Sequence, residues 1–134
     1  MPSRPLAGKM TVARRQTGQI AEDLVAERLA ASGWEIVERN ARTRYGELDI
    51  VALDGRVLVF LEVKGARLDT QFGPEKPILS INFRKQRQVR RLGTAWMAER
   101  RDFPPFDDIR FDAVGVTLDR AGRAVEVEHV EGAF

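Results

Sequence analysis

Residues 46–64 read GELDIVALDGRVLVFLEVK, and this stretch decides the fold. β-rich runs lie on both sides of Asp54-Gly55, at residues 47–53 and 56–64. Because Asp-Gly suits the positive φ angles of a type I′ turn, the stretch predicts a tight antiparallel hairpin. A two-residue turn at Asp54-Gly55 would pair Leu53 with Arg56 and thereby set every other pair of the hairpin.

Elements outside the hairpin are predicted from apolar spacing and from chain-breaking residues. Helical spacing predicts a first helix over residues 20–31, which Gly33 would end. Asn82 is a suitable N-cap for a second helix that runs to about residue 100. Further strands are predicted at residues 34–39, 109–118 and 123–130, with a polar loop at 40–46 and an irregular connection at 65–80. The order α-β-β-β-α-β-β indicates a mixed sheet with a helix on at least one face.

The length and composition favour a single domain. With 134 residues, of which 43% are hydrophobic, the chain has material for one modest core. Residues 1–15 show no sustained apolar period and are predicted to form a flexible basic arm, ahead of one domain over residues 16–134. The absence of cysteine excludes a disulfide framework, a thiolate zinc site and a cysteine nucleophile. Catalysis would therefore need carboxylates, lysines, hydroxyls or the single histidine.

The sequence gives no sign of a membrane segment. No apolar run approaches the ~20 residues that span a bilayer, and residues 1–10 lack the hydrophobic stretch of a secretory signal. We therefore expect a cytoplasmic protein without a membrane partner.

Charged residues are distributed unevenly along the chain. Basic residues predominate over residues 1–45 and 81–101, and acidic residues over 46–80 and 102–134. The alternation is compatible with carboxylates that bind a metal and arginines that bind a polyanion. Ordinary surface variation would produce the same alternation, so charge alone does not identify a partner.

Three acids and a lysine share one face of the predicted hairpin, namely Glu47, Asp49, Glu62 and Lys64. In that register Asp49 lies opposite Phe60 and diagonal to Glu62, roughly 7–8 Å away at the backbone. Mg²⁺ suits such a pair, since it prefers oxygen ligands and is commonly held by one or two carboxylates together with phosphate oxygens. The pair therefore predicts a divalent metal site with a phosphodiester as co-ligand.

Lys64 would reach the same site, where it would orient or deprotonate the attacking water or neutralise charge on the phosphorus oxygens. The alternative is that these charged residues only decorate the solvent side of a half-exposed hairpin. Against that alternative, residues 57–61 are apolar on both faces of the strand, and charges appear only near its end. Polar groups beside a buried surface are costly unless they are satisfied or used, which favours a site.

Two segments of the hairpin, GELD at 46–49 and FLEVK at 60–64, resemble the D…ExK core of the PD-(D/E)xK nuclease superfamily. Over about residues 14–118 the chain resembles more closely the bacterial YraN-like family of predicted endonucleases. The segments that carry this closer resemblance are TGQIAE at 17–22, Arg39-Asn40, GELD, LEVK, Phe72-Gly73 and Arg84-Lys85-Gln86. That family is distantly similar to archaeal Holliday-junction resolvases.

The resemblance implies a fold and a set of catalytic residues. The fold would be α/β, a restriction-endonuclease-like αβββαβ core with a central mixed sheet flanked by helices. Asp49 and Glu62 would bind Mg²⁺ or Mn²⁺, Lys64 would assist catalysis, and Glu22 would be a helix-borne acid of the same site. The sequence independently places Glu22 at the border of the apolar stripe of the first helix. The alternative for Glu22 is a favourable charge in an early helical turn.

The second helix carries a row of basic residues. Arg84, Arg87 and Arg91 line up on one side, where they would follow a phosphate backbone or form an ordinary solvated face. Lys85 and Gln86 are candidates for contacts near the scissile phosphate. Further candidates for phosphate contacts, because they flank the proposed site, are Arg44 and Arg67.

Two other polar residues are given structural roles. Asp112 is expected to pair with an arginine. His129 alternates with valines in the last predicted strand, so a packed or edge histidine is expected rather than a metal ligand or a base.

The function favoured by the sequence is hydrolysis of DNA phosphodiester bonds by a Mg²⁺-dependent endonuclease, with branched or flapped DNA among the substrates considered. Cleavage of opposed strands would favour a homodimer. The alternative is a nucleic-acid-binding module of the same fold, with little or no catalytic activity, that acts with a partner complex. A third hypothesis, a purely structural partner protein, leaves the acid and lysine set unexplained.

Overall fold

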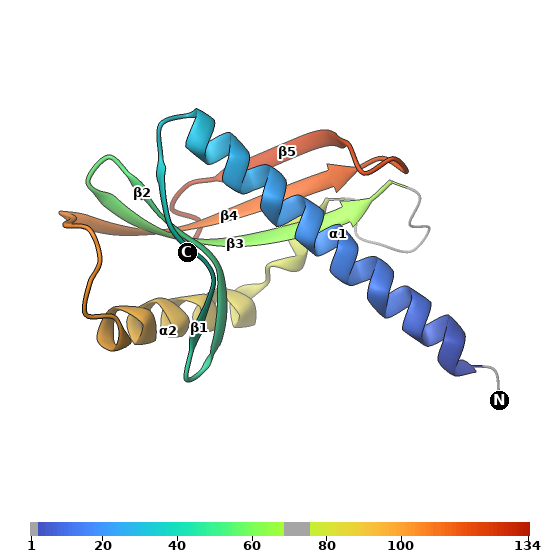
Figure 1. Cartoon of the computed structure of the whole chain (residues 1–134), viewed down its shortest axis with the longest axis horizontal. Helices are drawn as coiled ribbons and strands as arrows, with labels where there is room; N and C mark the ends of the chain where they lie inside the picture. The colour runs from blue at the N-terminus through green and yellow to red at the C-terminus, as the bar shows by residue number, and fades with distance from the viewer. Residues whose placement is uncertain (1–2, 69–75) are drawn as a thin grey trace.

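The structure, a computed structural model, describes residues 3–68 and 76–134, with side chains from residue 13 onward. In chain order the elements are α1 (Ser3–Ala31), β1 (Glu35–Thr43), β2 (Gly46–Asp54), β3 (Val57–Arg67), the 3-10 helix η1 (Pro77–Ser80), α2 (Phe83–Glu99), β4 (Asp108–Leu118) and β5 (Ala124–Val130). The strands form one sheet in the order β1-β2-β3-β4-β5, in which only the β3–β4 pair is parallel (Figure 1). This confirms the predicted α/β class, a mixed sheet with flanking helices and the element order of an αβββαβ core.

The two helices bury opposite faces of the sheet. Val25 and Leu29 of α1 form one buried cluster with apolar residues of β2, β3 and β4. Val89 and Trp96 of α2 form a second cluster with residues of β1, β2 and β3. Since β2 and β3 contribute to both clusters, their side chains are buried on both faces, as expected for strands that read as continuous apolar runs.

The β2–β3 hairpin has a different register from the predicted one. Leu53 pairs with Leu58 and not with Arg56, because the two turn residues are Gly55 and Arg56 instead of Asp54 and Gly55. Gly55, with φ +63°, takes the first turn position, where type II′ turns have glycine. The predicted register is therefore wrong by two residues. Because the shift is an even number, every side chain keeps its predicted face of the sheet.

α1 begins at Ser3, whereas the sequence predicted an arm without regular structure over residues 1–15. Neither glycine nor proline occurs between Gly8 and Gly18, so nothing in that stretch interrupts a helix. Pro5 falls in the first turn, where its missing N–H would have no intrahelical partner. Figure 1 shows this part of α1 extending beyond the sheet, so local helix propensity accounts for the additional turns.

β1 is also longer than predicted and includes most of the predicted polar loop at 40–46. It continues to Thr43, after which Arg44 and Tyr45 form a two-residue turn into β2. The Thr43 hydroxyl donates to the Gly46 carbonyl at 2.9 Å and accepts the Tyr45 N–H at 3.1 Å. These two hydrogen bonds stabilise a tight turn where sequence composition indicated a loop.

The second half of the chain follows the prediction closely. The Asn82 side chain caps α2 by accepting the Lys85 N–H at 3.0 Å, and β4 and β5 form within one residue of their predicted bounds. In the predicted irregular connection, residues 65–67 extend β3 and residues 77–80 form η1. The segment Phe72-Gly73, which contributed to the family resemblance, lies outside the described residues. Across the part of the chain that is described, no helix is long and apolar enough to cross a membrane.

Asp112 on β4 is fully buried and satisfied by protein groups. Its carboxylate accepts two hydrogen bonds from Arg110, at 2.9 and 3.0 Å, and one from the Gly132 N–H at 3.0 Å. His129 Nε2 lies 2.8 Å from the same carboxylate, and its ring packs on Trp34. Although burial raises the pKa of Asp112, these hydrogen bonds hold it below the usual value. The structural role predicted for Asp112, and a packed His129, are both confirmed.

Candidate functional site

β2 and β3 part at Asp49. The hydrogen-bonded pairs between them end at Ile50 and Leu61, while β2 stays paired with β1 beyond that point. Asp49 Oδ2 accepts the backbone N–H of Val63 at 2.8 Å. The carboxylate thus occupies the gap between the separating strands and satisfies an N–H that the sheet no longer pairs.

Glu62 lies beside Asp49 at this point. In the observed register the next position opposite Asp49 is Glu62, whereas the predicted register placed Phe60 there. Glu62 is 8% exposed, and the charge of Asp49 is near enough to raise its pKa. The two acids are therefore closer than the diagonal arrangement that the sequence predicted.

Burial and mutual repulsion alter the acidity of this pair. Burial raises the pKa of Glu62 to about 7, and the charge of Asp49 raises it as well. The pKa of Asp49 is also raised, mainly by burial, although the Val63 N–H favours its ionised form. Lys85 Nζ of α2 lies 3.3 Å from Glu62 Oε1 and stabilises the carboxylate. Two adjacent carboxyls that are largely removed from solvent ionise together only with difficulty, so a bound cation would stabilise the pair.

Glu22 of α1 is a third acid close to Asp49. Burial raises its pKa to about 7, the Asp49 charge raises it too, and Arg39 of β1 acts in the opposite direction. Glu22 Oε1 is buried without a hydrogen-bond partner in the part of the chain that is described. A buried carboxylate oxygen without a partner is costly, so this atom is a candidate ligand for a cation or a water.

The donor atoms fit a hard divalent cation, since all of them are carboxylate oxygens. Asp49 keeps one oxygen that makes no hydrogen bond to Val63, and Glu22 contributes an oxygen that lacks a partner. However, residues 3–68 and 76–134 contain no group of three acids or histidines arranged to hold one ion. The structure thus brings together Asp49 and Glu62, with Glu22 as an additional buried acid near Asp49.

An open groove of about 370 Å³ extends from Glu62 to the start of α2. The residues that line it are Glu62, Lys64, Ser80, Ile81, Asn82, Arg84, Lys85 and Gln88. Lys64 is exposed there, on the same strand as Glu62 and two residues beyond it. A basic groove with an acidic end has complementary groups for an anionic substrate and for a cation that bridges it.

Comparison with known sequences identifies the family. Residues 21–116 match the family described as "Uncharacterised protein family UPF0102". The chain belongs to the UPF0102 family. The matched range contains all four residues of the predicted acid and lysine set, namely Glu22, Asp49, Glu62 and Lys64.

Individual UPF0102 proteins align with the chain over nearly their full length. Those of Streptomyces griseus and Moorella thermoacetica are each 43% identical to it, over 120 and 125 residues. These alignments cover 90% and 93% of this chain and 97% and 100% of the relatives. The UPF0102 protein of Thermodesulfovibrio yellowstonii is 36% identical over 124 residues, which are 92% of this chain and 99% of the relative.

The predicted nucleic-acid contacts of this UPF0102 chain fall into two groups. Arg84 and Lys85 line the groove, whereas Arg87 and Arg91 lie farther along α2, each over an aromatic ring. Arg44 lies in the β1–β2 turn facing α2. The four arginines are exposed on the α2 side of the molecule, whereas Lys85 is half-buried and paired with Glu62.

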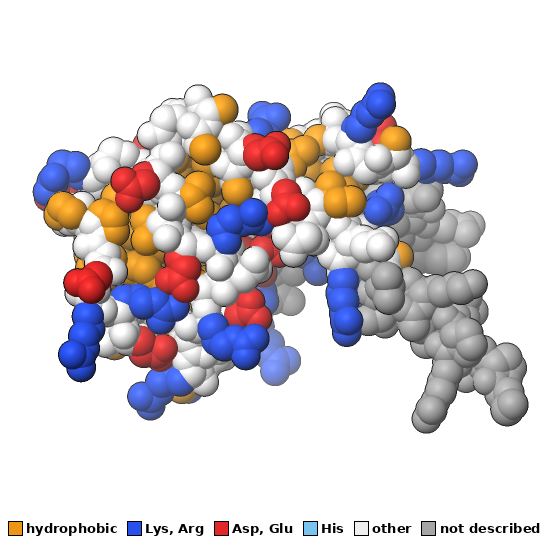
Figure 2. Space-filling view, in the orientation of Figure 1, with side chains coloured by type: hydrophobic (Ala, Val, Ile, Leu, Met, Phe, Trp, Pro, Cys, Tyr) orange, Lys and Arg blue, Asp and Glu red, His pale blue; other side chains and the backbone are white. Residues whose placement is uncertain are grey.

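The two remaining candidates are engaged within the chain. Gln86 donates to the Ile81 carbonyl at 3.3 Å, next to the helix cap. Arg67 donates to Thr17 Oγ1 at 2.9 Å and to the Arg120 carbonyl at 3.4 Å, on the α1 side of the sheet. Figure 2 shows acidic and basic side chains intermixed on the face that α1 crosses. The structure therefore separates Arg67 from the basic residues of the groove, whereas Gln86 lies beside the groove with its side-chain amide bonded to Ile81.

Sequence reasoning missed two partners of the acids. Lys85 was predicted to contact nucleic acid, but in the structure it also neutralises Glu62. Arg39 was only part of a resembling segment, yet it binds Asp23 at 2.6 Å and lowers the pKa of Glu22. Helical periodicity placed Lys85 on the sheet side of α2, which was the available signal, whereas nothing local to Arg39 indicated its position beside α1.

Proposed function

We propose that this chain is a metal-dependent endonuclease that hydrolyses phosphodiester bonds in DNA. The observation that carries the proposal is the adjacent pair of half-buried Asp49 and buried Glu62, with Glu62 lining a groove that also contains lysine and arginine side chains. Ligands for a cation beside donors for phosphate are the combination that phosphodiester hydrolysis requires. The resemblance of GELD and LEVK to the D…ExK core of PD-(D/E)xK nucleases supports the same activity.

Asp49 and Glu62 would hold a Mg²⁺ ion, with Mn²⁺ as the alternative, and Glu22 would contribute through its unpartnered oxygen. When bound, the ion supplies a Lewis acid that polarises the phosphate and lowers the pKa of a water. The Val63 N–H holds Oδ2 of Asp49 in place, and the other carboxylate oxygen takes no part in that hydrogen bond. Pre-orientation of this kind reduces the cost of assembling the site around a substrate.

The lysines of the groove would act on the phosphate. Lys64 is exposed beside Glu62, where its ammonium group would orient the attacking water or neutralise charge on the phosphorus oxygens. Lys85 pairs with Glu62 in this structure. With a cation held by the carboxyl pair, Lys85 would no longer be needed to neutralise Glu62 and would be free to contact a phosphate oxygen.

A second candidate is a nucleic-acid-binding module without catalytic activity, and one observation favours it. Lys85 already supplies a positive charge to Glu62 at 3.3 Å, so that carboxylate is satisfied without a metal. In that case the same groove and the same arginines would bind nucleic acid for a partner complex. Both candidates predict binding that weakens as salt rises, with a slope set by the number of phosphates contacted.

Cleavage of a labelled nucleic-acid panel tests the proposal. The panel comprises single strand, duplex, flap and four-way junction, each incubated with Mg²⁺, Mn²⁺ or EDTA. Asp49→Asn and Glu62→Gln are the preferred variants, because each removes a charge while keeping the size of a buried side chain. The matched control is Arg28→Ala, which removes a charged residue from an exposed position on α1, the helix on the other side of the sheet.

Metal-dependent products that disappear in both acid variants, but not in Arg28→Ala, would support the nuclease. Products that persist in Asp49→Asn would contradict the assigned site. Binding on the same samples without products under any metal would favour the non-catalytic module.

A further inference from the structure

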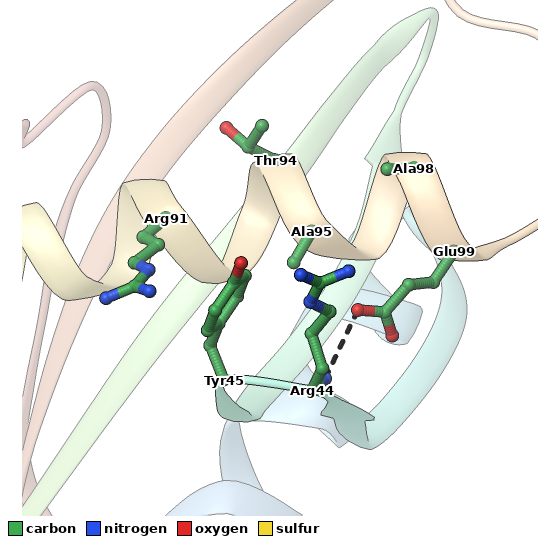
Figure 3. Close-up of a pocket in the computed structure, with 7 residues that line it drawn as sticks. All are labelled: Arg44, Tyr45, Arg91, Thr94, Ala95, Ala98 and Glu99. Carbon is green, nitrogen blue, oxygen red and sulfur yellow. Dashed lines mark hydrogen bonds between the residues drawn. The ribbon is translucent and has the colours of Figure 1, made fainter.

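A second pocket, separate from the carboxyl groove, lies between the β1–β2 turn and the C-terminal half of α2 (Figure 3). Its volume is about 460 Å³. The lining residues are Arg44, Tyr45, Arg91, Thr94, Ala95, Ala98 and Glu99. Neither the acid set nor the proposed cleavage reaction uses this pocket, so its composition calls for its own explanation.

The wall of the pocket is made of flat cationic and aromatic groups. Figure 3 shows the Tyr45 ring standing between the guanidinium groups of Arg91 and Arg44. The guanidinium carbons lie 3.9 Å and 5.0 Å from the ring centroid, and Tyr45 is 41% exposed. Stacking on the ring holds both guanidinium groups in place at the rim, with donors left for an anion.

The floor of the pocket is made of small residues of α2. Ala95 is buried and Ala98 is exposed, so neither side chain fills the space under the turn. Glu99 is the one acid of the lining, and its carboxylate is already engaged by the Arg44 N–H at 3.2 Å and lies 4.0 Å from Arg100. The two guanidinium groups therefore give the rim of the pocket a net positive charge, and the floor below them is apolar.

The β1–β2 turn lies against α2 at Gly46. A Cβ at this position would meet Leu92 at 3.4 Å and Gln88 at 3.9 Å, and the backbone has φ +138°. Gln88 also lines the carboxyl groove, and Arg91 lines the second pocket one turn farther along α2. The carboxyl groove and the second pocket are thus neighbours on α2, about one helical turn apart.

We propose that this second pocket binds one unpaired nucleotide, with the base on the alanine floor against the Arg44 guanidinium group, and its phosphate on Arg91. A flat apolar group with an attached anion matches a small apolar pocket with guanidinium groups at its rim. This inference rests on the proposed function and assigns its substrate class, a nucleic acid with at least one unpaired nucleotide near the cleaved bond. A fully paired duplex would offer the pocket only a phosphate.

The test is a comparison of binding affinities in EDTA, where cleavage is not required. Fluorescence anisotropy measures the Kd of the full chain for a 12-nucleotide single strand, for the duplex of the same sequence, and for the strand with abasic sites. Ala98→Leu fills the pocket from an exposed position. Its matched control is Ala30→Leu, an exposed alanine near the end of α1.

We expect Ala98→Leu to weaken single-strand binding about tenfold, the range of one lost base-stacking contact, and to change duplex binding less than about twofold. Ala30→Leu should change neither affinity. The abasic strand should bind the unmodified chain about as weakly as the normal strand binds Ala98→Leu. RNA and DNA strands are compared in parallel, since both have the required base and phosphate.

Unchanged single-strand binding in Ala98→Leu, or equal weakening for strand and duplex, would overturn the pocket assignment. Equal affinity for the abasic and normal strands would show that only phosphates are bound, which also overturns it. These outcomes are independent of cleavage. If Ala98→Leu weakens single-strand binding but no metal-dependent products form, the pocket assignment stands and the nuclease proposal fails. If metal-dependent products form but Ala98→Leu leaves single-strand binding unchanged, the nuclease proposal stands and the pocket assignment fails.

Discussion

Lys85 Nζ lies 3.3 Å from Glu62 Oε1, which joins the first turn of α2 to the middle strand of the sheet. The backbone of Lys85 is held by the Asn82 cap, so the position of its ammonium group depends on where the helix begins. Glu62 itself is buried next to Asp49. The ion pair therefore stabilises the carboxylate form of Glu62, and the lysine that does so belongs to a helix outside the β2–β3 hairpin.

Removing this lysine should make Glu62 less acidic. Lys85→Met should raise the pKa of Glu62 beyond about 7, because the positive charge that favours the carboxylate is lost. Titration of the side-chain carboxyl carbon by NMR measures the value. Arg84→Met, which changes the neighbouring exposed arginine, is the control and should leave that titration almost unaltered; equal effects of the two variants would contradict a specific pair.

Stability without divalent metal should decrease as pH rises from 5 to 8. The pKa values of Glu22 and Glu62 are raised from 4.5 to about 7, so the folded chain binds more protons than the unfolded chain in this window. Their stabilising contribution is complete below the unfolded-state pKa and is lost as pH rises through 7. Each pKa unit corresponds to about 1.4 kcal/mol of unfolding free energy.

Chemical denaturation in EDTA across this pH range checks the expectation. Glu62→Gln should flatten the dependence, since one of the groups with a raised pKa is gone. Addition of Mg²⁺ at pH 8 should raise the free energy of unfolding, because a bound cation replaces the protons. A pH dependence of opposite sign would contradict the assignment of raised pKa values.

Asp49 should contribute to stability as well as to chemistry. Asp49→Ala would leave the Val63 N–H without its acceptor and should cost about 1–3 kcal/mol of unfolding free energy even in EDTA. Asp49→Asn keeps a carbonyl oxygen in place and should cost less. Urea denaturation of the two variants measures the difference; equal losses would mean that the hydrogen bond to Val63 contributes nothing.

Two glycine substitutions in helices should have opposite effects. In Gly93→Ala the new Cβ would lie 2.9 Å from Phe111 and 3.1 Å from Phe60, so we expect a loss of about 1–3 kcal/mol from overpacking. Gly18→Ala on α1 meets nothing within 4 Å and should gain up to about 1 kcal/mol from helix propensity. Thermal denaturation measures both, and a stabilised Gly93→Ala variant would contradict the packing of α2 on the sheet.

Asp112 should be far more important for stability than an exposed acid. Asp112→Ala would leave Arg110 and His129 without their buried partner and should cost about 3–5 kcal/mol. Asp107→Ala removes an exposed partner of Arg56 and should cost far less, because solvent screens that ion pair. Urea midpoints of the two variants give the comparison; similar losses would contradict a structural role for the Asp112 cluster.

The parts of the fold that depend on neighbouring residues could be predicted. Asn82 before an amphipathic run indicated the start of α2, and the apolar alternation of residues 109–118 and 123–130 indicated β4 and β5. The start of α1 was wrong, because the mixed composition of residues 1–15 was interpreted as an arm although no glycine or proline interrupts residues 9–17. Neighbouring residues favour a helix, a strand or a turn, but the same short sequence is often compatible with more than one of these conformations.

The candidate site shows the same division. Hairpin alternation correctly placed Asp49 and Glu62 on one face, yet the choice between an Asp-Gly and a Gly-Arg turn moved the register by two residues. Turn type depends on how the two strands twist and pack, and Asp54 and Gly55 do not determine it alone. The acidic face of the hairpin is therefore the predicted one, but in the observed register Asp49 and Glu62 are closer together than predicted.

The sequence by itself determined which residue types are available, which strands and helices they form, and which face of the hairpin is acidic, because alternation and capping act over a few residues. Only the tertiary structure decided that β2 leaves β3 at Asp49, that β4 runs parallel to β3, and that α2 brings Lys85 to Glu62. Those features arise because two helices bury both faces of the sheet. The stabilising contacts are made between residues far apart in the chain, so no short segment determines them.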